Sequence, residues 1–76
     1  MSGDVRAAAA GRLLVEYGLA GAAVEVEGHE REIAAVRVRA EDWERLLGEE
    51  GARLVAEVKA LGFRYVALDL LPLDDA

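Results

Sequence analysis

The stretch KALGFRYVALDL, residues 59–70, joins the end of a helix to the start of a strand. Gly62 can adopt the positive-φ conformation that ends a helix, so we expect the chain to pass from helix to strand without an intervening loop. The apolar and aromatic residues that follow predict a buried strand, which Pro72 ends. Its expected core side chains are Phe63, Tyr65, Val66, Leu68 and Leu70. We expect the rest of the core to form around this helix–strand unit.

The length of the chain predicts one small domain, residues 1–76, in which 1–3 and 72–76 are frayed tails. Hydrophobic residues make up 54 % of the sequence, but much of this is Ala, Val and Leu, with one Trp, one Phe and two Tyr. Such a core is thin, and small domains gain stability by burying surface against a partner. We therefore expect a homodimer or a higher homo-oligomer.

The composition excludes several classes of function. The chain has no cysteine, which excludes disulfides, thiolate catalysis and cysteine metal sites. Neither a signal peptide nor an apolar run long enough to span a bilayer is present, so we expect a cytoplasmic protein without a membrane partner. The net charge of −6 opposes binding to nucleic acid and to anionic lipid.

Three helices are predicted. Asp4 suits a helix N-cap, and apolar residues spaced three and four apart continue this first helix to Gly18. Residues 40–47 predict a short helix with acidic residues at its start, and residues 52–61 predict a longer amphipathic one. The apolar side of the short helix is expected to consist of Trp43, Leu46 and Leu47.

Two strands are predicted between the first and second helices. Residues 23–27 alternate apolar and acidic side chains, which is typical of a strand with one face in water. A turn then leads into a returning strand, 32–38, and the two form a hairpin. In the returning strand we expect Val36 and Val38 to lie on the face opposite Arg37.

The predicted order of elements is αββααβ, which gives an α+β fold: a two-layer domain with a three-stranded sheet and helices packed on one face. The sequence leaves the strand order open, because the third strand can pair in parallel with the second or antiparallel with the first. In either arrangement the sheet has exposed edges and an uncovered face, and both are natural sites of self-association.

The segment GEEG, residues 48–51, lies between two predicted helices. KH-type RNA-binding domains carry a GxxG loop at this place, through which backbone amides approach the RNA backbone. Here Glu49 and Glu50 occupy the central positions, and their charges would repel a phosphate. We interpret GEEG as a structural kink or tight turn, with RNA binding as the less favoured alternative.

His29 is the only histidine and lies in the predicted hairpin turn. It could share a divalent cation with Glu27, Glu30 and Glu32, but no recognised ligand spacing supports a metal, and we favour a solvated turn. The acidic pairs Glu25/Glu27 and Glu30/Glu32 could act as general acid and base, but a solvated face is again the favoured interpretation. We predict no catalytic, cofactor-binding or metal-binding residue.

Three arginines are expected on neighbouring strands or at their ends: Arg37, Arg39 and Arg64. They could bind an anion or pair with acidic side chains across the sheet, and we favour the pairing. The acidic candidates for this pairing are Glu25, Glu27 and Asp69.

Two further residues have alternative roles. Trp43 could anchor a partner or close one end of the core, and we favour the core. Asp69 lies on the Tyr65 and Ala67 side of the third strand, where it could meet an arginine, cap a backbone group or lie at an interface. The candidate contacts for a partner or an anion are thus His29, Arg37, Trp43, Arg64 and Asp69.

The run GFRYVALDL, preceded by EDWERLLGEEGARLVAEVKAL, resembles the C-terminal domain of the LarE-type ATP-dependent sacrificial sulfur transferases. That family has an acidic helix start with a leucine pair, a long helix ending in Leu-Gly-Phe, and an aromatic-valine strand ending in Asp-Leu. The resemblance is best over Ile33–Leu70. It implies a fold similar to the dimerisation domain of GMP synthetases and to bacterial KH domains.

The sequence departs from that family at the positions that carry its chemistry. The transferases have a PP-loop ATP pyrophosphatase domain and use a sacrificial cysteine or a substitute sulfur carrier, and these 76 residues contain neither. Where the family has arginines leading into a histidine, Glu25 and Glu27 precede His29. After Asp-Leu the family continues with Gly-Tyr-Arg and Gly-Ser-Met-Asn, whereas LPLDD, residues 71–75, follows here. We therefore carry over no catalytic or phosphate-binding residue.

The sequence predicts a non-enzymatic oligomerisation or partner-binding module without a cofactor, a stand-alone relative of that C-terminal domain. The first alternative is an accessory subunit of a split PP-loop ATP pyrophosphatase or sulfur transferase, with a separate PP-loop protein as its partner. The second alternative is KH-like RNA binding through GEEG.

Overall fold

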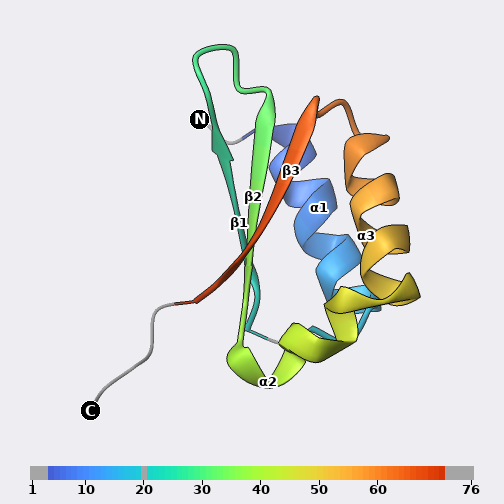
Figure 1. The fold of residues 1–76 in the computed structure, drawn as a ribbon. Helices are drawn as coiled ribbons and strands as arrows, with labels where there is room; N and C mark the ends of the chain where they lie inside the picture. Colours follow the sequence, from blue (N-terminus) through green and yellow to red (C-terminus); the bar gives the residue numbers. More distant parts are fainter. Residues whose placement is uncertain (1–3, 20, 72–76) are drawn as a thin grey trace.

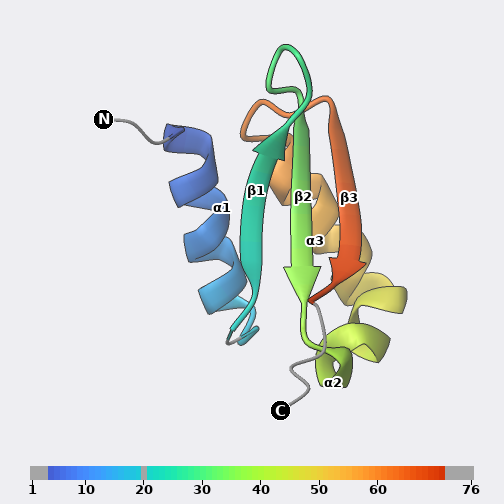
Figure 2. The same cartoon turned by 90° about the vertical axis from the view of Figure 1, so that its left-hand side faces the viewer.

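The computed structural model describes residues 4–19 and 21–71, which form a layer of helices against a three-stranded sheet (Figure 1). The predicted α+β class is confirmed. The long helices both lie on one face of the sheet, as predicted: Figure 1 shows them on the same side of the strands, and in Figure 2 α3 lies behind the strands and α1 beside β1. The ends predicted to be frayed, 1–3 and 72–76, lie outside the described residues.

The sheet has the order β1-β2-β3, in which β1 spans Ala23–Glu27, β2 spans Ile33–Val38 and β3 spans Tyr65–Leu70. β1 pairs antiparallel with β2, and β2 pairs in parallel with β3. Of the two arrangements that the sequence allows, the parallel one is therefore formed. The helices between β2 and β3 provide the long crossover that parallel neighbours need.

Helix α1, Val5–Glu16, begins at the predicted N-cap, because the Asp4 carboxylate accepts the N–H of the second helical residue at 2.9 Å. Its apolar side buries Ala10 and Leu14 in the core. The predicted end of the helix is also confirmed, since Gly18 adopts a φ of +75° just after the last turn.

The helical segment between β2 and β3 differs in detail from the prediction. It consists of one turn of α-helix, α2 (Ala40–Trp43), a 3₁₀ helix, η1 (Glu44–Leu47), and the longer α3 (Glu49–Lys59). α3 begins three residues before the predicted start at residue 52, so the two glutamates of GEEG are helical. Their carboxylates lie in the first turn, at the positive end of the helix dipole, which favours this earlier start.

The predicted apolar side of the segment 40–47 is only partly correct. Leu46 is buried and Trp43 packs partly buried against the core, which agrees with the favoured role of Trp43. Leu47, however, is 66 % exposed. The prediction assumed a continuous α-helix, whereas the tighter 3₁₀ turn changes the rotation per residue and directs Leu47 outward.

The core lies between the helices and one face of the sheet. The central strand contributes most to it, since Ala34, Val36 and Val38 are completely buried and point toward the helices. The predicted placement of Val36 and Val38 opposite Arg37 is confirmed, because successive side chains of a strand alternate between its faces.

β3 is not the buried strand that the sequence predicts. Val66 and Leu68 pack partly buried against the core, but Tyr65 is 57 % exposed and Leu70 is 43 % exposed. β3 is an edge strand with helices on only one face, so Tyr65 points to the uncovered face. Leu70, the register partner of the buried Val38, lies on the helix side and is the last residue of the strand. Apolar composition alone does not distinguish such a strand from a buried one.

The connection into β3 also differs from the predicted direct passage. α3 ends at Lys59, and residues 60–64 form a connection before β3. Gly62 does adopt a positive φ of +119°, as predicted, and Phe63 is buried in the core. The helix and the strand are therefore joined by a short turn that places an aromatic side chain between them.

Candidate interaction surface

The face of the sheet that no helix covers carries side chains from all three strands. The register of the strands aligns them in three cross-strand rows: Glu27–Ile33–Tyr65, Glu25–Ala35–Ala67 and Ala23–Arg37–Asp69. On this face the acidic side chains are concentrated on β1, whereas β3 contributes the Tyr65 ring, the Ala67 methyl group and one carboxylate, that of Asp69. The β3 side is therefore the less charged part of this face.

Arg37 neutralises much of the acidic charge on β1. Its guanidinium donates to Glu25 at 2.7 Å and to Glu27 at 3.4 Å. The hydrogen bond to Glu25 is the main cause of the raised pKa of Arg37, and Asp69 on the other neighbouring strand adds to it. The cross-strand pairing favoured for this residue is thus present in the structure.

Asp69 faces the uncovered side, next to Arg37 in the strand register, on the side predicted from the sequence. Its carboxylate accepts the backbone N–H of Leu70 at 2.8 Å. Of the roles considered for Asp69, capping of a backbone group is therefore formed. Arg37 and Asp69 are the two predicted candidates that the structure brings together.

The inner edge of β3 is hydrogen-bonded to β2. The N–H of Tyr65 donates to the carbonyl of Glu32 at 3.1 Å, and the N–H of Leu71 donates to the carbonyl of Val38 at 2.8 Å. In a strand, alternate residues direct their N–H and C=O groups to the same neighbour. Residues 65, 67, 69 and 71 therefore face β2.

The outer edge of β3 consequently carries the main-chain groups of residues 66, 68 and 70. The Leu70 N–H is the one that Asp69 accepts, so it already has a partner. β3 is the outermost strand of the sheet, and no described strand pairs with this edge (Figure 2). The N–H and C=O groups of Val66 and Leu68 are thus turned toward solvent, as is typical of an edge strand.

His29 lies in the exposed hairpin turn, as predicted, and apart from the other candidates. Glu32 does not face it as a ligand: its carboxylate accepts the N–H of Glu30 at 3.0 Å and fills the space beside Gly28, which adopts a φ of +99°. The acidic side chain therefore stabilises the turn. Among residues 4–19 and 21–71, no three His, Asp or Glu side chains converge as metal ligands.

The other candidates are dispersed. Arg39 pairs with Glu41 at the start of α2 rather than with the acidic strand residues, so the expected cross-strand pairing is wrong for this arginine. Arg64 is exposed just before β3. Trp43 is the last residue of α2 and packs partly buried against the core.

GEEG forms the start of α3. Gly48 is the N-cap residue, and Glu50 pairs with Arg45 at 2.8 Å, which lowers the pKa of Glu50. A Cβ on Gly51 would collide with the carbonyl oxygen of Leu46 in η1. The second glycine therefore permits close packing of two helices, which supports the structural interpretation of the motif.

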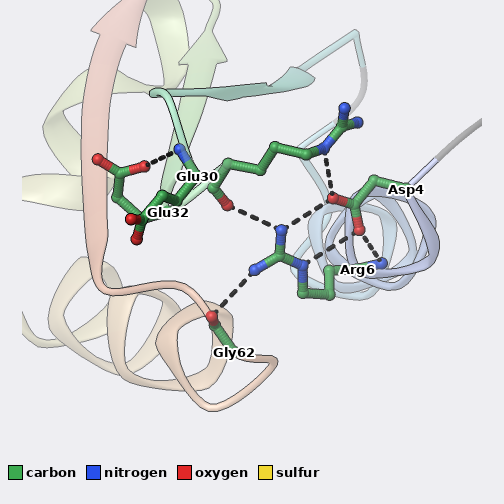
Figure 3. A network of polar contacts seen from close by, with 6 residues as sticks. Asp4, Arg6, Glu30, Glu32 and Gly62 are labelled. Carbon is green, nitrogen blue, oxygen red and sulfur yellow. Dashed lines mark hydrogen bonds and ion pairs between the residues drawn. The ribbon is translucent and has the colours of Figure 1, made fainter.

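Sequence reasoning missed a network around Arg6 (Figure 3). Its guanidinium donates to the Asp4 carboxylate at 2.9 Å, to the carbonyl of Gly62 at 3.0 Å and to the carbonyl of Arg31 at 2.8 Å. It also lies over the Phe63 ring, 4.3 Å from the centroid. Arg6 thus joins the start of α1, the hairpin turn and the connection into β3.

Arg45 and Tyr17 form a second connection that the sequence did not predict. Arg45 donates to the backbone carbonyl of Tyr17 at 2.6 Å, where its positive charge is favourable at the C-terminal end of α1. The Tyr17 hydroxyl donates to Glu57 of α3 at 2.7 Å, and this hydrogen bond raises the pKa of Tyr17. No local spacing in the sequence identifies either pair.

A groove of about 350 Å³ lies between α1 and α3 in the helical layer. Leu13 and Leu61 line it together with small residues, and Arg12, Glu16 and Glu57 add charge. The mixture of charges offers no matched set of groups for one ligand class. None of the helices in the described part of the chain has the length and apolar character that crossing a bilayer requires.

Comparison with known proteins adds no family to these observations. The chain matches no family model and no curated protein. The resemblance to the C-terminal domain of the sulfur transferases therefore stays a prediction from the residues quoted for it.

Proposed function

We propose that this protein is a protein-binding module that forms a homodimer through the β3 side of its sheet and carries out no reaction with its own side chains. The observation that carries the proposal is the one-sided architecture of the domain. The helices cover one face of the sheet, and β3 presents to solvent both its outer edge and its side chains on the other face.

Exposed apolar surface supports this proposal. Tyr65 and Leu70, at the two ends of β3, are large side chains with about half of their surface in water, at 57 % and 43 %. The buried core consists of small aliphatic residues and a single aromatic one, Phe63. A second copy packed against β3 would add to the apolar surface that this thin core removes from water.

The distribution of charge favours the β3 side over the rest of the uncovered face. β1 carries Glu25 and Glu27, which Arg37 only partly balances. β3 carries one acidic residue, Asp69, and Arg64 directly precedes the strand. Two copies of this chain each carry a net charge of −6, so they meet with least repulsion where the local charge is balanced.

The arrangement of the polar residues supports a role without catalysis. Three of the four acidic side chains considered as acid–base pairs have structural partners: Arg37 pairs with Glu25 and Glu27, and the Glu32 carboxylate accepts a backbone N–H of the hairpin turn. All of them lie on exposed strands or turns. An acid–base pair for catalysis is instead expected in a cleft with strongly shifted pKa values.

Sedimentation velocity over a range of protein concentrations tests the proposal. We expect the weight-average mass to rise from that of one chain toward that of two as the concentration reaches the high micromolar range. Added salt should strengthen the association, because it screens the repulsion between two acidic copies. A chain that stays monomeric at high micromolar concentration in high salt would contradict the proposal.

A further inference from the structure

We infer that two copies of this chain pair their β3 strands antiparallel across a two-fold axis that passes beside Ala67, so that the two sheets join into one. This inference rests on the proposed homodimer and specifies its interface. It follows from which main-chain groups of β3 are free, from the charge of the two sheet edges, and from the position of Asp69.

The free main-chain groups select the kind of contact. The outward N–H and C=O groups of Val66 and Leu68 form one half of a ladder, and another strand supplies the complementary half. A strand of a second copy is self-complementary here, since each of these residues offers one donor and one acceptor. Side-chain packing alone would leave these groups to water.

The alternation of side chains restricts the register. In an antiparallel pair, residues directly opposite each other point to the same face of the sheet. A two-fold axis must therefore pass beside one residue and its own copy, and the two central choices are Ala67 and Leu68. Each choice keeps core-facing residues opposite core-facing residues.

Asp69 distinguishes the two registers. An axis at Leu68 would oppose Val66 to Leu70 of the second copy, although the Leu70 N–H already donates to Asp69 at 2.8 Å. It would also bring the two Asp69 carboxylates diagonally close. An axis at Ala67 instead pairs Val66 with Leu68 of the second copy and places Asp69 opposite the uncharged Tyr65.

The other edge of the sheet does not offer an equivalent contact. β1 carries two glutamates on the uncovered face, Glu25 and Glu27, and an antiparallel pair of β1 strands would bring both sets together. Like charges across neighbouring strands are destabilising. The structure therefore favours β3 over β1 as the edge at which two copies meet.

The substitution Ala67→Lys tests this interface, with Ala23→Lys as its matched control. Both alanines are exposed on the same face of the sheet, and both substitutions reduce the negative charge of the chain equally. Ala67→Lys places two like charges on the two-fold axis and should raise the dimer dissociation constant at least about tenfold. Ala23→Lys should leave the dissociation constant unchanged within about twofold. Circular dichroism verifies that both variants are folded.

A single cysteine gives a second, positive test, because the chain has no other thiol. Residues on the axis of a non-hydrogen-bonded pair have Cα atoms about 4.5 Å apart, which a disulfide can span. Ala67→Cys should therefore form a covalent dimer under mild oxidation, whereas Ala23→Cys should stay monomeric.

The outcomes separate this inference from the proposed function. A monomeric wild-type chain contradicts both. A wild-type dimer that Ala67→Lys leaves intact, or that cross-links through Ala23→Cys instead of Ala67→Cys, keeps the homodimer and contradicts the β3 interface. Loss of the dimer in Ala67→Lys alone, together with the cross-link at residue 67, supports both.

Discussion

Arg6 connects parts of the chain that are far apart in the sequence. Its guanidinium reaches Asp4, the carbonyls of Arg31 and Gly62, and the ring of Phe63. A planar group with several fixed donors suits such a site, because it can satisfy three acceptors at once. The sequence places Arg6 only on the polar side of a helix, since its partners become neighbours only when the hairpin and the turn before β3 are in place.

The same network makes stability depend on the ionisation of Asp4. The hydrogen bond from Arg6 is the main cause that holds the pKa of Asp4 far below its ordinary value of 3.8. A carboxylate whose pKa is lowered in the folded state stabilises the protein at pH values above its pKa in the unfolded chain. That stabilisation is lost as the pH falls below this value.

We therefore expect the urea midpoint of the wild type to fall between about pH 5 and about pH 2 more steeply than that of Asp4→Asn. Asparagine keeps the helix N-cap but has no charge to lose. Glu16→Gln serves as a control, because it removes a carboxylate from an exposed position in α1 outside the network. Equal pH dependence of the wild type and Asp4→Asn would show that the network does not contribute in this way.

Among the elements, the junction of η1 and α3 depends most on a single small residue. Gly51 is buried in the first turn of α3, and the carbonyl of Leu46 occupies the space that a side chain would need. The GEEG motif was predicted to be a kink or tight turn between helices, but only Gly48 lies between η1 and α3, and the other three residues are helical. Its sequence could not reveal that the second glycine lies inside a helix against a backbone carbonyl, because this depends on the packing of η1.

Gly51→Ala should destabilise the protein by about 1–3 kcal/mol, although alanine favours helices, because the added methyl group forces η1 and α3 apart. Gly11→Ala is the matched control: Gly11 lies within α1 with no atom near its Cβ position, so this substitution should stabilise by about 0.5–1 kcal/mol. Urea denaturation measures both. A stabilising Gly51→Ala would contradict the packing described here.

β3 shows what apolar sequence can and cannot predict about an element. Its existence and the positive φ at Gly62 follow from local signals, namely a run of apolar residues after a helix-ending glycine. Its burial does not, because an edge strand of a one-sided sheet exposes half of its side chains whatever their polarity. Tyr65, on the uncovered face, and Leu70, on the helix side at the end of the strand, were both predicted to be core residues but are exposed.

For the whole molecule, the periodic spacing of apolar residues in the sequence was sufficient to predict the fold class. The helical spacing before Gly18 and the alternation in 23–27 specify a helix and a strand with one covered face, which leads to two layers. The parallel pairing of β2 with β3 was not predictable, since both arrangements keep the same side chains in the core. The sequence predicted that exposed sheet edges and an uncovered face are sites of self-association. It could not predict that β3 forms one of these edges, because that depends on the strand order.

Hydrogen exchange of the Val66 and Leu68 amides is the most direct measurement of the interface at β3. These N–H groups point to the outer edge of the sheet, so they are unprotected in one chain and hydrogen-bonded in the paired dimer. We predict that their exchange slows as the protein concentration rises, and that Ala67→Lys abolishes this change. Fast exchange of both amides at every concentration, in a sample that sedimentation shows to be dimeric, would contradict pairing through β3.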